Sequence, residues 1–227
     1  METTALHIED WGLLDYGQAF ERQAQMVHQR LQGTGRDTLV LVEHPQTVTL
    51  GRRATAADLH FPEALYAECG VTLKKINRGG LATAHEPGQL VAYPVIALKK
   101  KDLRWFADQF LLVVIHLLAD YGIEGRLKAG EPGVWVDGRK ICSFGIALKK
   151  WISSHGIALN INNSLDTFDM IVPCGQPQEV VTSLRRELGE AVDQDLIKDR
   201  FVTHFCKAFD YHQSQTELNQ WRVNRRV

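Results

Sequence analysis

Two runs near the middle of the chain have the residue patterns of β-strands. The first, residues 134–141, holds Asp137-Gly138 between two β-rich segments. Because a type I′ turn needs positive φ at both central residues, this pair predicts a β-hairpin. The second run, residues 154–162, has Ile157, Leu159 and Ile161 on one side and Gly156, Ala158, Asn160 and Asn162 on the other. The chain must therefore build a sheet, and the small, polar face of this strand leaves room for something other than side chains.

Three longer segments repeat apolar residues at helical spacing, so we expect helices that bury one stripe against the sheet. Asp15 can cap the first, which the Gly33-Thr34-Gly35 cluster ends. The second covers residues 106–121. The third covers residues 197–209, and we expect it to form a small satellite with the carboxyl-terminal tail.

Shorter apolar runs predict the remaining strands, at residues 38–43, 48–50, 71–76 and 90–98, and a short helix at 61–69. Pro94 suggests that its strand lies at an edge or carries a bulge. No segment has the composition of a flexible linker. The sequence thus predicts a single α+β domain, residues 1–227, with a mixed β-sheet flanked by helices. Its core spans about residues 10–190, and a C-terminal helical extension spans about 191–227.

Charge and composition exclude several classes of protein. The 227 residues carry a formal net charge of −1, which argues against a nucleic-acid binder. The longest apolar run, residues 110–119, is interrupted by His116 and falls short of the roughly 20 residues that a membrane span requires. The 4 cysteines show no paired spacing. This argues against a zinc site or a disulfide framework and favours a cytoplasmic location.

A cysteine and a lysine have the setting of a reactive pair. Cys174 lies between Pro173 and Gly175, which predicts a sharply shaped turn. Lys140 follows the Asp-Gly turn and should be held on a strand. An ammonium group near a thiol favours the nucleophilic thiolate. The residues alone leave the alternative of a passive, packed cysteine open, since nothing in the sequence proves that the two side chains touch.

The other cysteines are interpreted as packing residues. Cys69 ends the short helix and Cys206 lies in the last long helix. Cys142 is two positions from Lys140, so we expect it on the same strand face and near the site.

Residues 78–91, Arg-Gly-Gly-Leu-Ala-Thr-Ala-His-Glu-Pro-Gly-Gln-Leu-Val, resemble the signature of the lipoyl (octanoyl) transferase family. Further blocks follow in that family's order: Glu43-His44-Pro45, Leu50-Gly51-Arg52-Arg53-Ala54, Gly133-Val134-Trp135-Val136, Arg139-Lys140-Ile141, Ser154-His155-Gly156, Ala158-Leu159-Asn160, Pro173-Cys174-Gly175 and Val181-Thr182-Ser183-Leu184. The resemblance covers roughly residues 10 to 190. It departs from the family at Ala84-His85-Glu86, where Tyr-His-Gly is usual, and at Cys142-Ser143, where Ala-Ala is usual.

The resemblance implies a lipoate/biotin-ligase-like architecture, related to class II aminoacyl-tRNA synthetases and biotin synthetase. It implies a catalytic dyad of Cys174 and Lys140 and no metal, ATP or bound cofactor. The residues that it places at the substrate are Arg78, Gly79, Gly80, Leu81, Ala82, Thr83, Ala84, His85, Ser143, Phe144, Gly145, His155, Gly156, Ile157 and Ala158. A solvated Arg78 in a simple turn is the alternative interpretation of the first block.

The activity implied is transfer of an octanoyl group from octanoyl-acyl carrier protein, through a Cys174 thioester, to a specific lysine of a lipoyl domain. Implied acceptors are the E2 subunits of 2-oxoacid dehydrogenases and the glycine cleavage H protein. Three alternatives remain at this stage: an ATP-dependent lipoate-protein ligase, an octanoyl amidotransferase between lipoyl domains, and a non-catalytic acyl- or carrier-binding module. A carrier protein is acidic, so docking should use a local basic patch, for which the candidates include Arg52, Arg53, Lys74, Lys75, Lys149 and Lys150.

Overall fold

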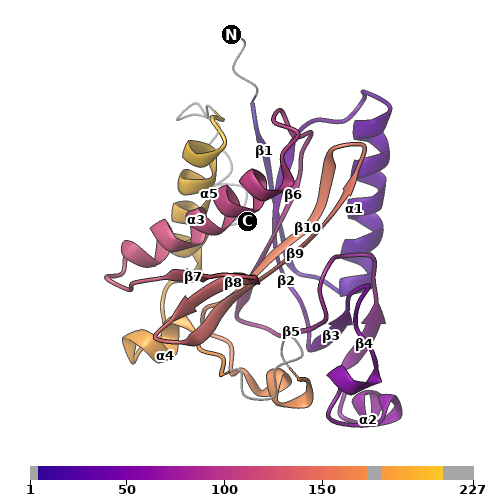
Figure 1. The fold of residues 1–227 in the computed structure, drawn as a ribbon, viewed down its shortest axis with the longest axis vertical. Helices are drawn as coiled ribbons and strands as arrows, with labels where there is room; N and C mark the ends of the chain where they lie inside the picture. Colours follow the sequence, from indigo (N-terminus) through magenta and orange to yellow (C-terminus); the bar gives the residue numbers. More distant parts are fainter. Residues whose placement is uncertain (1–4, 173–179, 212–227) are drawn as a thin grey trace.

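The computed structural model describes residues 5–172 and 180–211. A mixed seven-stranded sheet forms its centre, in the order β1-β2-β6-β10-β9-β8-β7, and a three-stranded sheet, β4-β3-β5, lies beside it (Figure 1). The large sheet comprises β1 (His7–Leu13), β2 (Thr38–Glu43), β6 (Gln89–Val95), β7 (Arg126–Lys128), β8 (Glu131–Val136), β9 (Arg139–Lys149) and β10 (Ile152–Asn160). The small sheet comprises β3 (Thr47–Leu50), β4 (Thr72–Lys75) and β5 (Ala82–His85).

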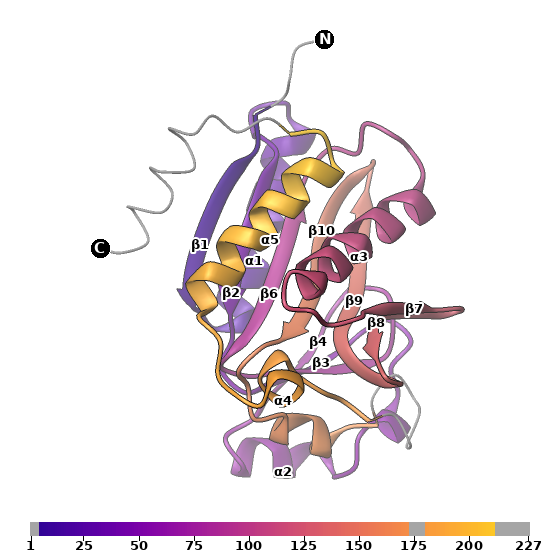
Figure 2. The same cartoon turned by 90° about the vertical axis from the view of Figure 1, so that its left-hand side faces the viewer.

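Helices cover both faces of the large sheet. The helices of the described chain are α1 (Tyr16–Leu31), α2 (Glu63–Glu68), α3 (Leu103–Ala119), α4 (Leu184–Leu188) and α5 (Gln194–Ala208), with the 3₁₀ turns η1 (Ala56–Asp58) and η2 (Asp166–Met170). Of these, α2 packs against the small sheet. Figure 2 shows α3 and α5 side by side on one face and α1 behind the other. The described chain is therefore α+β with helices on both sides of a mixed sheet, as predicted. None of the described helices is long and apolar enough to cross a membrane.

The core follows from alternation along the buried strands. On β2, Leu39 and Leu41 pack into the main apolar cluster with α3 and α5, whereas Val40 and Val42 pack with Ala19 of α1. Both faces of this strand are covered, which explains its continuous apolar sequence.

The predicted hairpin is confirmed, and a second one follows it along the chain. Asp137 and Gly138 have φ of 47° and 77°, as a type I′ turn requires, and they join β8 to β9. At the other end of β9, Lys150 and Trp151 have φ of 49° and 66° and form the tip between β9 and β10.

The expectation for Cys142 was wrong. The pairing of β8 with β9 shifts register between Val134 and Trp135, because Val134 faces Cys142 whereas Trp135 faces Lys140. The shift breaks the two-residue alternation, so Lys140 points to the substrate side and Cys142 packs into the main core. Burial raises the pKa of the Cys142 thiol well above its usual range, against the weaker influence of Lys140.

Of the two alternatives predicted for Pro94, an edge strand or a bulge, the edge strand was wrong. β6 lies between β2 and β10. Its pairing with β10 ends at Ala92, opposite Ile157, and an isolated bridge resumes at Ala97, opposite Ile152. Pro94 lies in that interruption, where its missing N–H removes no ladder bond.

The last helix does not form a satellite. Phe201 and Phe205 of α5 are fully buried in the main core, where both contact Phe110 of α3. Buried polar links hold the same helix to the sheet. Lys198 Nζ donates to Asp10 of β1 at 2.9 Å.

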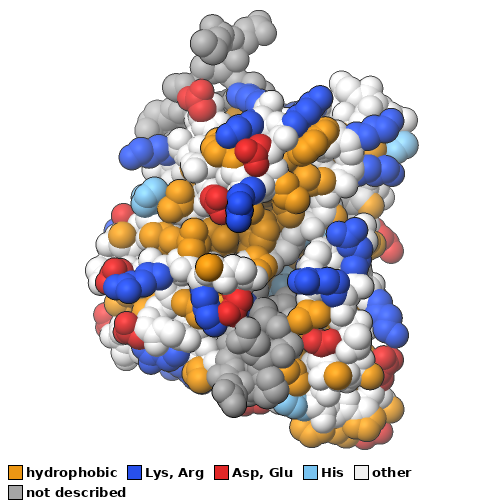
Figure 3. All heavy atoms as spheres, viewed as in Figure 1, with side chains coloured by type: hydrophobic (Ala, Val, Ile, Leu, Met, Phe, Trp, Pro, Cys, Tyr) orange, Lys and Arg blue, Asp and Glu red, His pale blue; other side chains and the backbone are white. Residues whose placement is uncertain are grey.

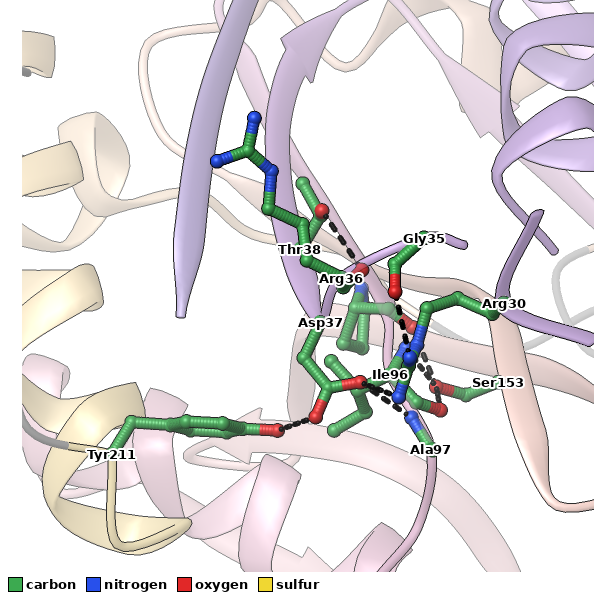
Figure 4. Close-up of polar contacts among 10 residues, drawn as sticks. Arg30, Gly35, Arg36, Asp37, Thr38, Ile96, Ala97, Ser153 and Tyr211 are labelled. Atoms are coloured by element: carbon green, nitrogen blue, oxygen red, sulfur yellow. Dashed lines mark hydrogen bonds and ion pairs between the residues drawn. The ribbon is translucent and has the colours of Figure 1, made fainter. Parts of the chain in front are cut away.

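The segment after α5 is fixed to the start of β2 by a buried carboxylate (Figure 4). Asp37 accepts from the Tyr211 hydroxyl at 2.9 Å and from the Ala97 N–H at 2.8 Å, and it pairs with Arg30 Nη2 at 2.8 Å. Arg30 also donates to the Gly35 carbonyl at 2.8 Å. One side chain thus joins α1, β2, the end of β6 and the end of the described chain.

Candidate functional site

A cavity of about 250 Å³ lies between the small sheet and the strands β6, β9 and β10. Lys140 is at its wall, and so are most of the residues predicted to bind substrate: Arg78, Gly80, Leu81, Ala82, Thr83, His85, Ser143, Phe144, Gly145, His155, Gly156, Ile157 and Ala158. The structure therefore brings together residues that are widely separated in the sequence.

Two predicted residues do not line this cavity. Ala84 is fully buried in the apolar cluster of the small sheet. Gly79 instead donates its N–H to the Ile146 carbonyl, and so ties the 78–81 loop to β9. Several wall residues were not predicted from the sequence: Tyr16, Arg53, Val91, Tyr93, Gly130, Glu131 and Pro132.

Arg78 is a structural part of the wall rather than a solvated side chain. It is only 7% exposed. Its Nη2 donates to the carbonyl and hydroxyl oxygens of Thr49 at 2.8 and 2.9 Å. Gly145 leaves the space that the Arg78 stem needs, because a Cβ there would lie 3.1 Å from Arg78 Cδ. The glycines of this region serve close approach of backbone and guanidinium.

His85 is buried and its ring orientation is set by Gln89. The Gln89 amide nitrogen donates to Ala84 O and Asn160 Oδ1, so its oxygen accepts from His85 Nδ1–H at 2.9 Å. Burial, followed by repulsion from His44, lowers the pKa of His85 well below its usual value. This imidazole is therefore neutral near neutral pH.

His155 closes the same wall from β10, with φ of 58°. Its Nε2 lies 2.7 Å from Asn77 Oδ1, and its backbone N–H donates to Gln23 of α1. Burial, with a smaller effect of Arg78, lowers the pKa of His155 to about 4. Burial also raises the pKa of the neighbouring Tyr16 to about 12. His155 and Tyr16 thus add polar but uncharged groups to the cavity.

Lys140 stands on β9, as predicted, and its side chain is 2% exposed. The ammonium nitrogen lies 4.7 Å from the centre of the Trp135 ring. Its backbone pairs with the chain just beyond residue 179: Lys140 N–H donates to Val180 O, and Thr182 N–H donates to Lys140 O.

Cys174 lies outside the described residues, so its separation from Lys140 is not part of this geometry. The described residues on both sides are anchored. The Val172 N–H donates to Asp58 O at 3.0 Å, and Val180 O accepts from Lys140. Among the residues that the structure does describe, no cluster of His, Cys, Asp or Glu is arranged to hold a metal ion.

Solved structures with the same arrangement of helices and strands define the fold class. A chain from the bipartite lipoate protein ligase of Thermoplasma acidophilum and its E2 lipoyl domain matches with a TM-score of 0.73 at 14% identity, over 97% of this chain and 91% of that one. A biotin protein ligase from Aquifex aeolicus matches with a TM-score of 0.54 at 14% identity, over 92% and 71%. The lipoate/biotin-ligase-like architecture is confirmed, and at this identity the likeness concerns the fold alone.

Sequence comparisons are more specific. The family described as lipoyl protein ligase A/B catalytic domain matches residues 15–206. An octanoyltransferase of Nitratidesulfovibrio vulgaris is 41% identical over 205 residues, 89% of this chain and 94% of the relative. One of Rubrobacter xylanophilus is 44% identical over 196 residues, 86% and 89%. The chain belongs to the lipoyl protein ligase A/B catalytic domain family.

Proposed function

We propose that the protein is an octanoyltransferase that moves an octanoyl group from octanoyl-acyl carrier protein to a lysine of a lipoyl domain. The observation that carries the proposal is the near-full-length similarity to octanoyltransferases at 41–44% identity. The cavity is consistent with it, because a narrow slot beside a buried lysine suits an acyl chain whose carbonyl reacts at one end.

In the proposed first step, the Cys174 thiolate attacks the thioester carbonyl of the donor. A new carbon–sulfur bond forms, the old one breaks, and the departing pantetheine sulfur takes a proton from the Lys140 ammonium. In the second step, the amine of the acceptor lysine attacks the acyl-enzyme. Lys140, now a neutral amine, takes the proton from the attacking nitrogen, and the Cys174 thiolate leaves. Both groups return to their starting charges.

The cavity wall has a defined part in this reaction. Gly156 and Ala158 lie on the strand face that the alternation predicted to be small, and both line the cavity. His85 and His155 are neutral, so binding of the apolar acyl chain does not require either side chain to be desolvated as an ion. Arg78 ties the 78–81 loop to Thr49 of β3, and the Gly79 N–H ties the same loop to Ile146 of β9, so the two bonds together maintain the width of the slot.

The site is also expected to bind the carrier protein, which is acidic. A groove of about 490 Å³ lies beside the cavity, and His155 lines both. Arg52 and Lys149 flank this groove, together with the apolar Phe20 and Leu148. Figure 3 shows Lys and Arg side chains around a band of hydrophobic atoms on one face of the molecule. We propose that the carrier docks over this groove through Arg52, Lys149 and the adjacent Lys150.

The other basic candidates fit docking less well. Arg53 lines the catalytic cavity itself. Lys75 pairs with Glu63 at 3.5 Å. The same proposal includes the lipoyl-domain acceptors, which are E2 subunits and the H protein. It also includes a cytoplasmic location, because Cys69, Cys142 and Cys206 are free thiols, as is usual in a reducing compartment.

Intact mass spectrometry tests the proposed function directly. After mixing with octanoyl-acyl carrier protein and no ATP, the protein should gain one octanoyl group, and an apo lipoyl domain should then remove it. A requirement for ATP and free octanoate would instead indicate a ligase. An octanoylated lipoyl domain that outperforms the carrier protein as donor would indicate an amidotransferase, and an adduct that never turns over would indicate a binding module.

A further inference from the structure

Trp135 is the aromatic side chain in contact with Lys140, and the proposed reaction gives it no role. It stands on β8 directly opposite Lys140 in the β8–β9 pairing. It is only 4% exposed and does not line the substrate cavity. The Lys140 ammonium nitrogen lies 4.7 Å from the centre of its ring, within the range of a cation–π interaction.

A second ammonium lies near the same indole. Lys128 Nζ of β7 is 5.8 Å from the ring centre. Lys128 is half exposed and pairs with Glu131 at 2.6 Å, so its charge is largely balanced by that carboxylate. Lys140 is much more deeply buried, and the indole lies beside it as a fixed surface of negative potential.

The backbone is shaped to make this contact possible. The register shift of β8 against β9 turns Lys140 toward the cavity. Gly133, two residues before Trp135, leaves space for the lysine stem: a Cβ there would lie 2.8 Å from Lys140 Cε and 2.5 Å from Cys142 O. Because the second of these atoms is backbone, the structure cannot yield easily. The lysine stem is thus confined between Gly133 and the Trp135 ring.

The physical consequence concerns charge. Burial favours the neutral amine over the ammonium, because the charged form loses its hydration. An aromatic face in a desolvated setting stabilises the cation and so offsets part of the lost hydration energy. Indole is the most effective of the natural aromatic rings in this respect. A charged Lys140 is the form that stabilises a nearby thiolate.

We propose that Trp135 is a positioning residue for Lys140, whose indole face keeps the ammonium charged and directed into the substrate cavity. The inference rests on the proposed function, in which Lys140 assists Cys174. It adds that the reactivity of the cysteine depends on the π-electron density of a side chain that does not line the substrate cavity.

Fluorinated tryptophan tests this with almost no change of shape, since each fluorine withdraws electron density from the ring. The protein is produced with tryptophan, a monofluoro and a trifluoro analogue. The rate of alkylation of Cys174 by iodoacetamide at neutral pH is followed by peptide mass spectrometry. It should fall progressively along the series, by about two- to thirtyfold in total, which corresponds to the strength of a cation–π contact.

All 5 tryptophans are labelled in this experiment, so a matched background is needed. In a Trp135→Phe protein, the same three preparations should alkylate at one common rate. Trp135→Phe itself should retain part of the wild-type rate and Trp135→Leu less, with thermal unfolding reporting whether either variant folds. Trp105→Leu is the matched control for loss of a lysine–indole contact. Trp105 is on α3, and the Lys100 ammonium nitrogen lies 5.0 Å from the centre of its ring. This substitution should leave the rate unchanged.

A flat fluorine series in the otherwise wild-type protein would reduce Trp135 to a packing residue and overturn the inference. Lys140→Met separates this from the proposed function. If that variant slows alkylation while fluorination does not, only the role of Trp135 is lost. If Lys140→Met leaves alkylation unchanged, the proposed dyad itself is wrong.

Discussion

Glu86 provides the sharpest test of how the structure supports the segment before Cys174. Its carboxylate is 2% exposed. It accepts hydrogen bonds from the Leu165 N–H at 2.5 Å, the Thr167 N–H at 3.0 Å and the Asn163 side chain at 2.9 Å. Glu86 thus holds the start of η2 against β5. The sequence resemblance has glycine at this position, and the structure shows that the departure braces a neighbouring turn rather than altering the cavity wall.

The magnitude follows from the number of donors. A hydrogen bond to a charged group contributes about 1.5–3 kcal/mol, and a buried donor left without a partner costs about 1–3 kcal/mol. Glu86→Gln is nearly isosteric but replaces one acceptor oxygen by NH₂, so it should lower the free energy of unfolding by about 1–3 kcal/mol. Glu86→Ala strands all three donors and should cost about 3–6 kcal/mol, a large share of the stability of a typical domain.

Urea denaturation measures the free energies, and native-state hydrogen exchange locates the effect. In Glu86→Gln, the amides of Leu165 and Thr167 should exchange faster than those of β6. Glu63→Gln is the control, since that glutamate is exposed and pairs with Lys75 on the surface; it should change stability by less than about 0.5 kcal/mol. Equal stability of Glu86→Gln and Glu63→Gln, with unchanged exchange at Leu165, would refute the reasoning.

Four further predictions follow from the site. Cys174→Ala should abolish the octanoyl adduct while leaving thermal unfolding unchanged; an adduct of wild-type yield, or one that maps to Cys142, would contradict the assignment. Lys140→Met should slow alkylation of Cys174 and reduce acyl transfer by about 10²–10⁴-fold, as expected for loss of general acid–base help; transfer within a factor of two of wild type would remove Lys140 from the mechanism. Reversal of Arg52, Lys149 and Lys150 to Glu should raise KM for octanoyl-acyl carrier protein but not for octanoyl-pantetheine. The control Lys207→Glu, on α5, should change neither KM. Equal loss of activity with both donors would exclude docking of the carrier protein through these residues. The free energy of unfolding should fall as the pH drops from about 6.5 to 4, because burial lowers the pKa values of His44 and His155 to about 4. In this interval the unfolded chain binds protons that the folded chain does not, which costs on the order of 3 kcal/mol for each histidine. A free energy of unfolding that stays constant over this interval would contradict the burial of neutral imidazoles.

Features determined by neighbouring residues could be predicted from the sequence. The Asp137-Gly138 turn depends on the φ preferences of two residues, and the alternation along β10 depends on period two alone. The Asp15 cap is equally local, and the structure shows its side chain accepting from the Gln18 N–H. The cavity wall contributed by Gly156 and Ala158 follows from the same alternation.

Features that depend on pairing between strands could not be predicted from the sequence. The side on which Cys142 lies is decided by one register shift against β8, which no local pattern announces. Pro94 is tolerated in a central strand because the pairing of β6 with β10 is interrupted at that point. Tyr93 was missed as a wall residue for the same reason. Only the pairing of β6 with β10 places the face that holds Val91 and Tyr93 next to Ala158.

The two carboxylates that hold the carboxyl-terminal part of the chain have a consequence for synthesis on the ribosome. Asp10 meets Lys198 across 188 positions of sequence, and Asp37 meets Tyr211 across 174. At a synthesis rate of about 5–20 residues per second, on the order of 10–40 s pass between synthesis of each carboxylate and synthesis of its partner. Until then the first two strands lack both these bonds and the apolar cover of α5. A nascent chain that stalls before Tyr211 should therefore expose this edge of the sheet to chaperones and proteases, and native structure should appear late and all at once.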